Sequence, residues 1–118
     1  MNKSEYISTV ENYDIIHQKV EQIEAIYKTK VSGFLAKAIS FADNSIFIED
    51  EKRVLAFSEI IQLDKDYENT FTTNGLIPII DCYDGVFIVF IVSESMWAKY
   101  STSDMSIFKK RPIISELI

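Results

Sequence analysis

The chain has 118 residues, of which 47% are hydrophobic and 13% aromatic, so it is not disordered and we expect one folded domain over residues 1–118. Its 18 acidic and 12 basic side chains leave a formal charge of −6. This charge disfavours direct binding to nucleic acid, because phosphate contacts need Lys and Arg, and it suits attraction to a basic protein partner.

Cysteine content and apolar run length indicate the compartment. Cys82 is the sole cysteine, so no internal disulfide can form and a reducing cytoplasm is favoured. The N-terminal residues contain no apolar core of the kind that signal peptides have. The longest apolar run, Val86–Val92, is far too short to span a membrane. The sequence therefore predicts a soluble cytoplasmic protein without membrane contact.

Two apolar stripes at helical spacing predict two N-terminal helices. The first predicts one helix over about residues 8–28 and consists of Tyr6, Val10, Tyr13, Ile16, Val20, Ile23 and Tyr27. The second predicts a helix capped by Thr29 and stopped by Asp43-Asn44, and consists of Val31, Phe34, Leu35, Ala38, Ile39 and Ala42.

A short hairpin is expected next. Ile46–Ile48 and Val54–Phe57 read as strands joined across the acidic loop Glu49-Asp50-Glu51. Ser58 is the expected cap of a short helix that follows the second strand. The polar residues Asp64–Asn74 are expected to form a loop.

The stretch around Asp84-Gly85 organises the rest of the chain. Leu76–Ile80 and Val86–Val92 flank this dipeptide, which favours a tight hairpin turn of the primed type. The second run shows no alternation of apolar and polar residues, so we expect a central strand buried on both faces. Pro78 lacks an amide donor and predicts either an edge strand or a bulge.

The C-terminal residues complete the expected fold. Met96–Tyr100 reads as a further strand, and Pro112–Ile118 as a closing helix. The predicted fold is α+β, with an antiparallel sheet of about five strands covered by the N-terminal helices and the short C-terminal helix.

No arrangement of residues indicates catalysis. His17 is the sole histidine and reads as a surface or half-buried helix residue. Cys82 stands beside carboxylates that disfavour a thiolate, so it reads as a packed residue. Asp81 and Asp84 are better explained as turn residues than as a metal or acid–base pair. We expect no enzyme activity, no metal and no cofactor, and we interpret Lys109-Lys110-Arg111 as a solvated rim.

Acidic residues accompanied by aromatic ones suggest a protein-binding face. Interfaces use aromatic side chains as anchors and charge for steering. The ordinary alternative is a solvated surface above core aromatics. The candidate residues are Glu49, Asp50, Glu51, Asp64, Asp66, Asp81, Tyr83, Asp84, Glu94 and Trp97.

Four segments resemble the Smi/Knr family of the SUKH superfamily, small bacterial proteins best known as immunity proteins. They read VEQIEAIYKTKVSGFLAKAI, IFIEDEKRVLAFSEIIQ, LIPIIDCYDGVFIVFIVSESMWAKYS and FKKRPIISELI. The resemblance implies a helical pair, a strand, a short helix entered at Leu55–Ile60, an Ile-Pro-Ile strand, a central strand and a C-terminal helix. It also implies a non-enzymatic protein that binds a cognate toxin domain, often a nuclease, and blocks its active site.

Two functions therefore remain open. The first is an immunity protein that binds a basic toxin through an acidic face, and the second is a regulatory or scaffold module of the same fold with no toxin partner. The oligomeric state is open between a monomer and a homodimer that pairs through Leu76–Cys82.

Overall fold

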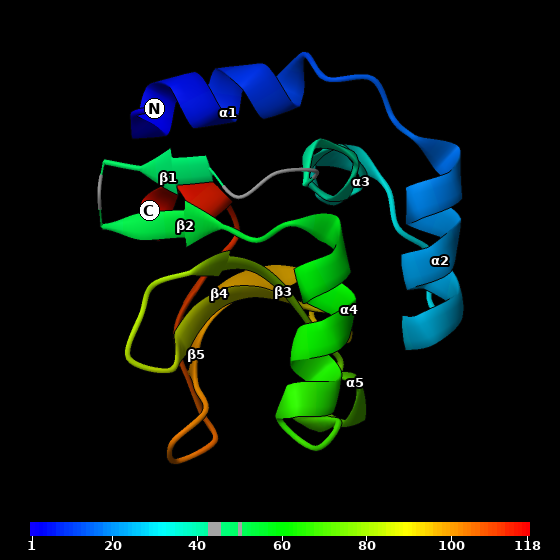
Figure 1. The fold of residues 1–118 in the computed structure, drawn as a ribbon, viewed down its shortest axis with the longest axis vertical. Coiled ribbons are helices and arrows are strands. Elements are labelled where there is room, and N and C mark those ends of the chain that lie inside the picture. The colour runs from blue at the N-terminus through cyan, green and yellow to red at the C-terminus, as the bar shows by residue number, and fades with distance from the viewer. Residues whose placement is uncertain (43–45, 50) are drawn as a thin grey trace.

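The computed structural model describes residues 1–42, 46–49 and 51–118 (Figure 1). Its centre is an antiparallel sheet of six strands, in which each strand pairs with the next along the chain. The predicted α+β class is confirmed, with six strands in place of about five. The strands are β1 (Ile46–Ile48), β2 (Lys52–Val54), β3 (Leu76–Asp81), β4 (Val86–Ile91), β5 (Met96–Ser101) and β6 (Ser106–Arg111).

The described helices gather beside this sheet. They are α1 (Lys3–Glu11), α2 (His17–Tyr27), α3 (Gly33–Phe41), α4 (Phe57–Asp66), α5 (Thr70–Thr73) and the 3₁₀ turn η1 (Ile114–Glu116). Helix α3 contacts both α1 and α2, whereas α4 and α5 lie against β3 (Figure 1). None of these helices combines the length and the apolar content needed to cross a lipid bilayer.

The single helix predicted over residues 8–28 is wrong, because the chain leaves the helix after Glu11 and re-enters it at His17. Asn12 ends α1, and its side-chain amide donates to the carbonyl of Ser8 at 2.8 Å. The amide of Ile16 donates to the buried hydroxyl of Ser40 at 2.8 Å. Side-chain hydrogen bonds thus replace the helical ones at this break.

Helix α3 begins later than predicted. Ser32 occupies the N-cap position, so the assignment of Thr29 was wrong. Gly33 follows with φ of +61°, a left-handed conformation that glycine adopts at low cost. The amide of Val31 donates to the carboxylate of Glu24 at 2.8 Å, which ties the end of α2 to the start of α3. The predicted stop at Asp43-Asn44 lies outside the described residues.

The first hairpin is confirmed by the pairing of β1 with β2. The second strand ends at Val54, earlier than predicted, and Ala56 rather than Ser58 is the N-cap of α4. The carboxylate of Glu59 accepts from the amide of Ala56 at 3.0 Å and from Arg53 at 2.7 Å. The helix therefore starts where Glu59 reaches back to its first turn.

The predicted loop over Asp64–Asn74 is only partly correct. Helix α4 continues to Asp66, and α5 follows within the same stretch. The buried carboxylate of Asp64 accepts from both the amide and the hydroxyl of Thr72, each at 2.9 Å. These two bonds hold α5 against α4.

The turn between β3 and β4 is the predicted primed hairpin. The amide of Val86 donates to the carbonyl of Tyr83 at 3.0 Å, and φ is positive at Asp84 and at Gly85. The register shifts between Pro78 and Ile80, so the bulge alternative for Pro78 is confirmed. Strand β3 lies inside the sheet, so it is not an edge strand and a homodimer cannot pair through it.

The central strand is confirmed as β4, which lies between β3 and β5 and is covered on both faces. Phe87 pairs with Tyr100, and both pack with Phe71 of α5. Phe90 pairs with Trp97 on the opposite face, where the indole meets Phe34 of α3. The continuous apolar sequence of β4 reflects this two-sided packing.

The C-terminal prediction was wrong in two respects. Strand β6 was not predicted, although Lys109-Lys110-Arg111 within it is exposed as expected, and only the single turn η1 forms where a helix was expected. Ile114 and Leu117 are buried, whereas Ile113 is 57% exposed.

A candidate protein-binding surface

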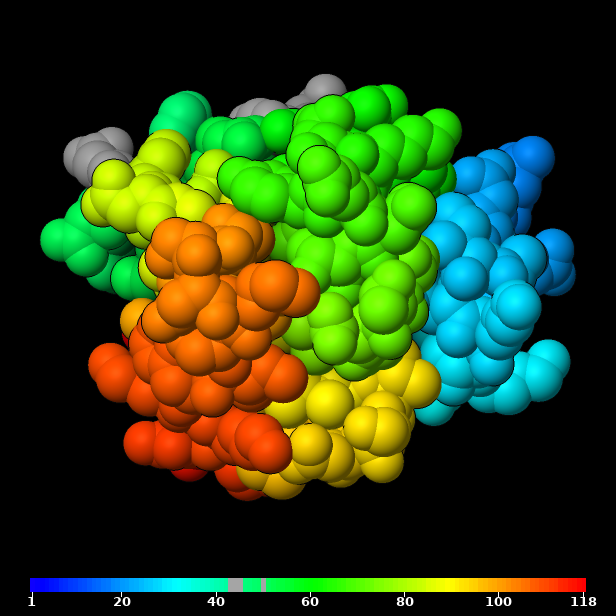
Figure 2. Space-filling view, turned by 90° about the horizontal axis from the view of Figure 1, so that it is seen from below, coloured from blue at the N-terminus to red at the C-terminus, as the bar shows by residue number. Residues whose placement is uncertain are grey.

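Three hairpin turns lie at one end of the sheet. In an antiparallel meander alternate turns fall at the same end, so the β1–β2, β3–β4 and β5–β6 turns lie together. Figure 2 views this side of the molecule, where the yellow-green β3–β4 turn adjoins the orange β5–β6 turn. The β4–β5 turn lies at the opposite end.

We call the exposed residues of these turns, together with the half-buried Asp81 at the end of β3, the turn surface. Its described members are Glu49, Glu51, Asp81, Tyr83, Asp84, Asp104 and Met105. The first five are candidates from the sequence, and the topology brings them to one end of the sheet. The sequence did not identify Asp104 and Met105 as candidates. Because strand β6 was not predicted, the β5–β6 turn that contains them was not predicted either.

Two carboxylates of the turn surface are fixed by hydrogen bonds. Asp81 accepts from the amide of Tyr83 at 2.7 Å and from Arg53 at 3.4 Å. Asp104 accepts from the hydroxyl of Ser106 at 2.8 Å, and this bond is the main cause that lowers the pKa of Asp104. Both side chains are thus held in place by these hydrogen bonds.

Tyr83 is an aromatic residue in an unusual backbone conformation. Its φ is +68°, and its side chain is 39% exposed at the tip of the β3–β4 hairpin. A left-handed conformation costs a residue with a Cβ about 1–2 kcal/mol. The ring is only partly buried, so packing does not fully account for a tyrosine at this position.

Met105 adds a second exposed apolar side chain, on the β5–β6 turn. It is 63% exposed and also has a positive φ. Met105 and Thr102 line a shallow hollow of about 230 Å³ together with Tyr67 and Glu68 from the end of α4. The turn surface therefore continues onto the α4–α5 connection, where Glu68 adds another carboxylate.

The remaining candidate residues lie elsewhere. Asp64 and Trp97 are buried, at 8% and 5% exposed. Glu94 sits in the β4–β5 turn at the opposite end and pairs with Lys110 at 3.0 Å. Asp66 lies at the end of α4, where it accepts from Gln62 at 3.0 Å. Asp50 lies outside the described residues, and a partner-binding role for any of these residues stays a prediction.

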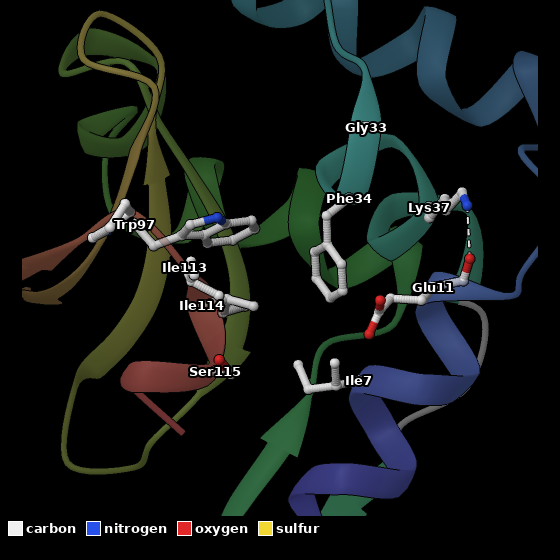
Figure 3. Close-up of a pocket in the computed structure, with 10 residues that line it drawn as sticks. Ile7, Glu11, Gly33, Phe34, Lys37, Trp97, Ile113, Ile114 and Ser115 are labelled. Carbon is white, nitrogen blue, oxygen red and sulfur yellow. Dashed lines mark hydrogen bonds between the residues drawn. The ribbon is translucent and has the colours of Figure 1, made fainter.

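A pocket occurs at the opposite end of the sheet, around Trp97. We call it the Trp97 pocket; its volume is about 570 Å³, and α1, α3, β5 and the C-terminal residues form its walls (Figure 3). The rings of Trp97 and Phe34 meet edge to face, with centroids 6.1 Å apart. Its walls are mainly apolar, with Glu11 and Lys37 as charged members.

His17 and Cys82 are the other residues that were considered for chemistry. His17 is exposed at the start of α2, as predicted. Burial raises the pKa of the Cys82 thiol, more than the nearby charge of Asp81 does. Among the described residues, no three His, Cys, Asp or Glu side chains are grouped so as to hold a metal ion.

Comparison with known proteins gives no relative. No protein-family model matches the chain, and no curated protein or solved structure is significantly similar to it. The functional argument therefore rests on the residues and their geometry.

Proposed function

We propose that this protein is a non-enzymatic bacterial immunity protein that binds a cognate toxin domain in the cytoplasm through the turn surface. The observation that carries the proposal is the gathering of carboxylates and two exposed apolar side chains on three adjacent turns. Turns on a rigid sheet are suitable positions for binding residues, because the scaffold fixes them in space.

Electrostatics favours a basic partner for this surface. The chain carries a formal charge of −6, and the turn surface contributes five described carboxylates, of which Asp81 is offset by Arg53. A nuclease binds its substrate in a cleft lined with Lys and Arg. Carboxylates held on turns would take the place of phosphates in such a cleft and would speed association by steering.

The order of elements also supports the proposal. The resemblance implies a helical pair, a strand, a short helix, an Ile-Pro-Ile strand, a central strand and a C-terminal helix. Helix α4 begins within Leu55–Ile60, and Ile77-Pro78-Ile79 lies in β3. The departure is at the C-terminus, where a single turn stands in place of a helix.

The experiment neutralises the turn surface and measures association. The partner to test is the C-terminal domain encoded by the gene next to that of this protein. The variant is Glu49→Gln, Glu51→Gln and Asp84→Asn, which raises the net charge by three. We expect the association rate at low salt to fall by about tenfold, with a weaker dependence on salt.

The matched control is Asp14→Asn, Glu21→Gln and Glu116→Gln, which raises the net charge by the same amount. These three side chains are exposed, belong to none of the three turns and have no side-chain hydrogen bond within the described structure. The control should change the association rate much less. Equal slowing by both variants would mean that net charge alone acts, and it would remove the turn surface as the binding site.

A further inference from the structure

Strand β6 is an open edge of the sheet. Within the described structure it pairs with β5 on one side and with no strand on the other. The opposite edge, β1, is covered by hydrogen bonds with Met1. In Figure 2 the orange-to-red segment that contains β6 forms one side of the molecule. The backbone along its outer side is therefore accessible to an extended segment of another molecule, which can add a further strand there.

Exposed apolar side chains are concentrated on and beside this edge. Ten large apolar side chains are exposed among the described residues, and four of them lie within residues 105–113: Met105, Ile107, Phe108 and Ile113. Lysine and a bulge are sufficient to protect an edge strand, and exposed apolar residues do not add to that protection. Their concentration here indicates a surface that another molecule covers.

The charge along this edge is positive, although the chain carries −6 overall. Lys109-Lys110-Arg111 are consecutive and exposed, and Lys99 lies on the neighbouring strand β5. Of these four cations, only Lys110 pairs with a carboxylate in the part of the chain that the structure describes, namely Glu94 at 3.0 Å. Asp104 lies in the turn before β6, at the other end of the strand. The C-terminal half of β6 therefore keeps an excess of positive charge.

We propose that the β6 edge binds an extended acidic segment of a partner protein by strand addition. Backbone hydrogen bonds supply the pairing, and apolar residues of the segment cover Ile107 and Phe108. Its carboxylates pair with Lys109 and Arg111. A basic segment would be repelled at this end of the strand. A second copy of β6 would bring its own three cations to the edge, so the same charges oppose self-pairing and favour an acidic strand.

The inference goes beyond the proposed toxin-binding role. The turn surface is acidic and suits a basic partner, whereas the β6 edge suits an acidic one. The variant Glu49→Gln, Glu51→Gln and Asp84→Asn should therefore weaken toxin binding without weakening binding at β6. Failure of one proposal leaves the other in place.

The test titrates the protein with three blocked hexapeptides and follows its amide signals by NMR. The first peptide is acetyl-Glu-Val-Glu-Thr-Glu-Val-amide, the second has glutamine in place of each glutamate, and the third is the acidic peptide with every backbone amide N-methylated. We expect the acidic peptide to bind about five times more tightly than the glutamine peptide at low salt, and to slow hydrogen exchange at amides of β6. The N-methylated peptide keeps the charge but cannot donate hydrogen bonds to a strand, so it should bind more weakly and protect no amide of β6.

Variants assign the preference to the β6 edge. Lys109→Gln with Arg111→Gln should remove most of the preference for the acidic peptide. The matched control, Lys30→Gln with Lys65→Gln, lowers the net charge equally at exposed positions outside the strands and should keep the preference. Absence of binding, equal binding of the three peptides, or a preference retained without the two cations of β6 would overturn the proposal. Tighter binding of a single-stranded oligonucleotide of equal charge would overturn the assignment to a protein segment.

Discussion

At the scale of single residues, two buried tyrosines differ in the pairing of their hydroxyl groups. The hydroxyl of Tyr6 is buried and has no partner among the described residues. Burial alone raises its pKa far above the usual value. The hydroxyl of Tyr100 lies 2.9 Å from that of Thr70. The two side chains therefore allow a matched comparison.

We expect opposite effects from the same chemical change. Tyr6→Phe removes an unpaired buried hydroxyl, so the free energy of unfolding should stay the same or rise by up to about 1 kcal/mol. Tyr100→Phe breaks a hydrogen bond and should lower it by about 1 kcal/mol. Urea unfolding measures both values, and an equal loss in the two variants would mean that Tyr6 has a polar partner.

Among the acidic candidate residues, Asp64 is buried and stabilises the fold. Its carboxylate accepts both bonds from Thr72, so Asp64→Asn replaces a charged acceptor by an amide donor, and the Thr72 hydroxyl can then donate only to the carbonyl of Asn69. We expect a loss of about 1–3 kcal/mol in the free energy of unfolding. Asp66→Asn, two residues away on the exposed side, is the control and should change stability little. Similar losses in the two variants would contradict this assignment.

At Tyr83 we expect a single substitution to increase the stability of the fold and to weaken partner binding. Tyr83→Asn keeps a residue that tolerates positive φ and removes the exposed ring. We expect the free energy of unfolding to rise by about 0.5–1 kcal/mol and partner binding to weaken. Unfolding and titration of the same sample measure both. A variant that is more stable and binds equally well would show that the ring has no part in recognition.

At the scale of elements, the two edges of the sheet are protected differently. The ammonium of Met1 donates to the carbonyl of Phe47, and the amide of Glu49 donates to the carbonyl of Met1, each at 3.0 Å. These bonds cover β1. Strand β6 has no such cover among the described residues, but it carries Lys109-Lys110-Arg111 and an irregular register against β5. Charges and bulges oppose pairing with another copy of the chain.

Removal of that protection should promote self-association. Lys110→Val and Arg111→Val together give β6 an apolar edge next to Ile107 and Phe108, which are already partly exposed. We expect the sedimentation coefficient to rise with protein concentration in this variant and to stay constant in the parent chain. The control Lys65→Val, on α4, should behave as the parent. Association in the parent itself would show that the charges do not protect the edge.

The elements that could be predicted from the sequence are those whose pattern of apolar residues indicates burial. Strand β4 was found because burial on both faces requires a continuous apolar run, and the β3–β4 turn because Asp84-Gly85 suits positive φ. Strand β6 was missed because its residues are mostly exposed, so no burial pattern marks them. The break between α1 and α2 was missed because apolar spacing continues across it, although Asn12 and Asp14 are residues that favour turns.

The turn surface could be predicted only in part. Its acidic turns follow from the sequence, but their convergence depends on the number and order of the strands. Asp64 and Trp97 show the limit of the sequence argument, because composition does not separate an exposed carboxylate or indole from a buried one. Asp64 is buried through contact with Thr72, which follows the end of its helix, and Trp97 through contact with Phe34, which is distant in sequence.

At the scale of the whole molecule, the acidic turn surface and the main pocket described above lie at opposite ends of one sheet. The turn surface gathers carboxylates with Tyr83 and Met105, and the opposite end holds the Trp97 pocket. A net charge of −6 would attract a basic partner over several ångströms before contact, and salt would weaken that attraction. The central claim is that the turn surface neutralises such a partner.

The most direct measurement is the growth of bacteria that express the neighbouring gene's C-terminal domain, with and without this protein. The account predicts that the domain alone stops growth, that the parent chain restores it through a salt-sensitive one-to-one complex, and that the variant Glu49→Gln, Glu51→Gln and Asp84→Asn restores it less well. Growth that the correctly folded parent chain fails to restore, with no complex formed, would contradict the immunity role and favour a regulatory module.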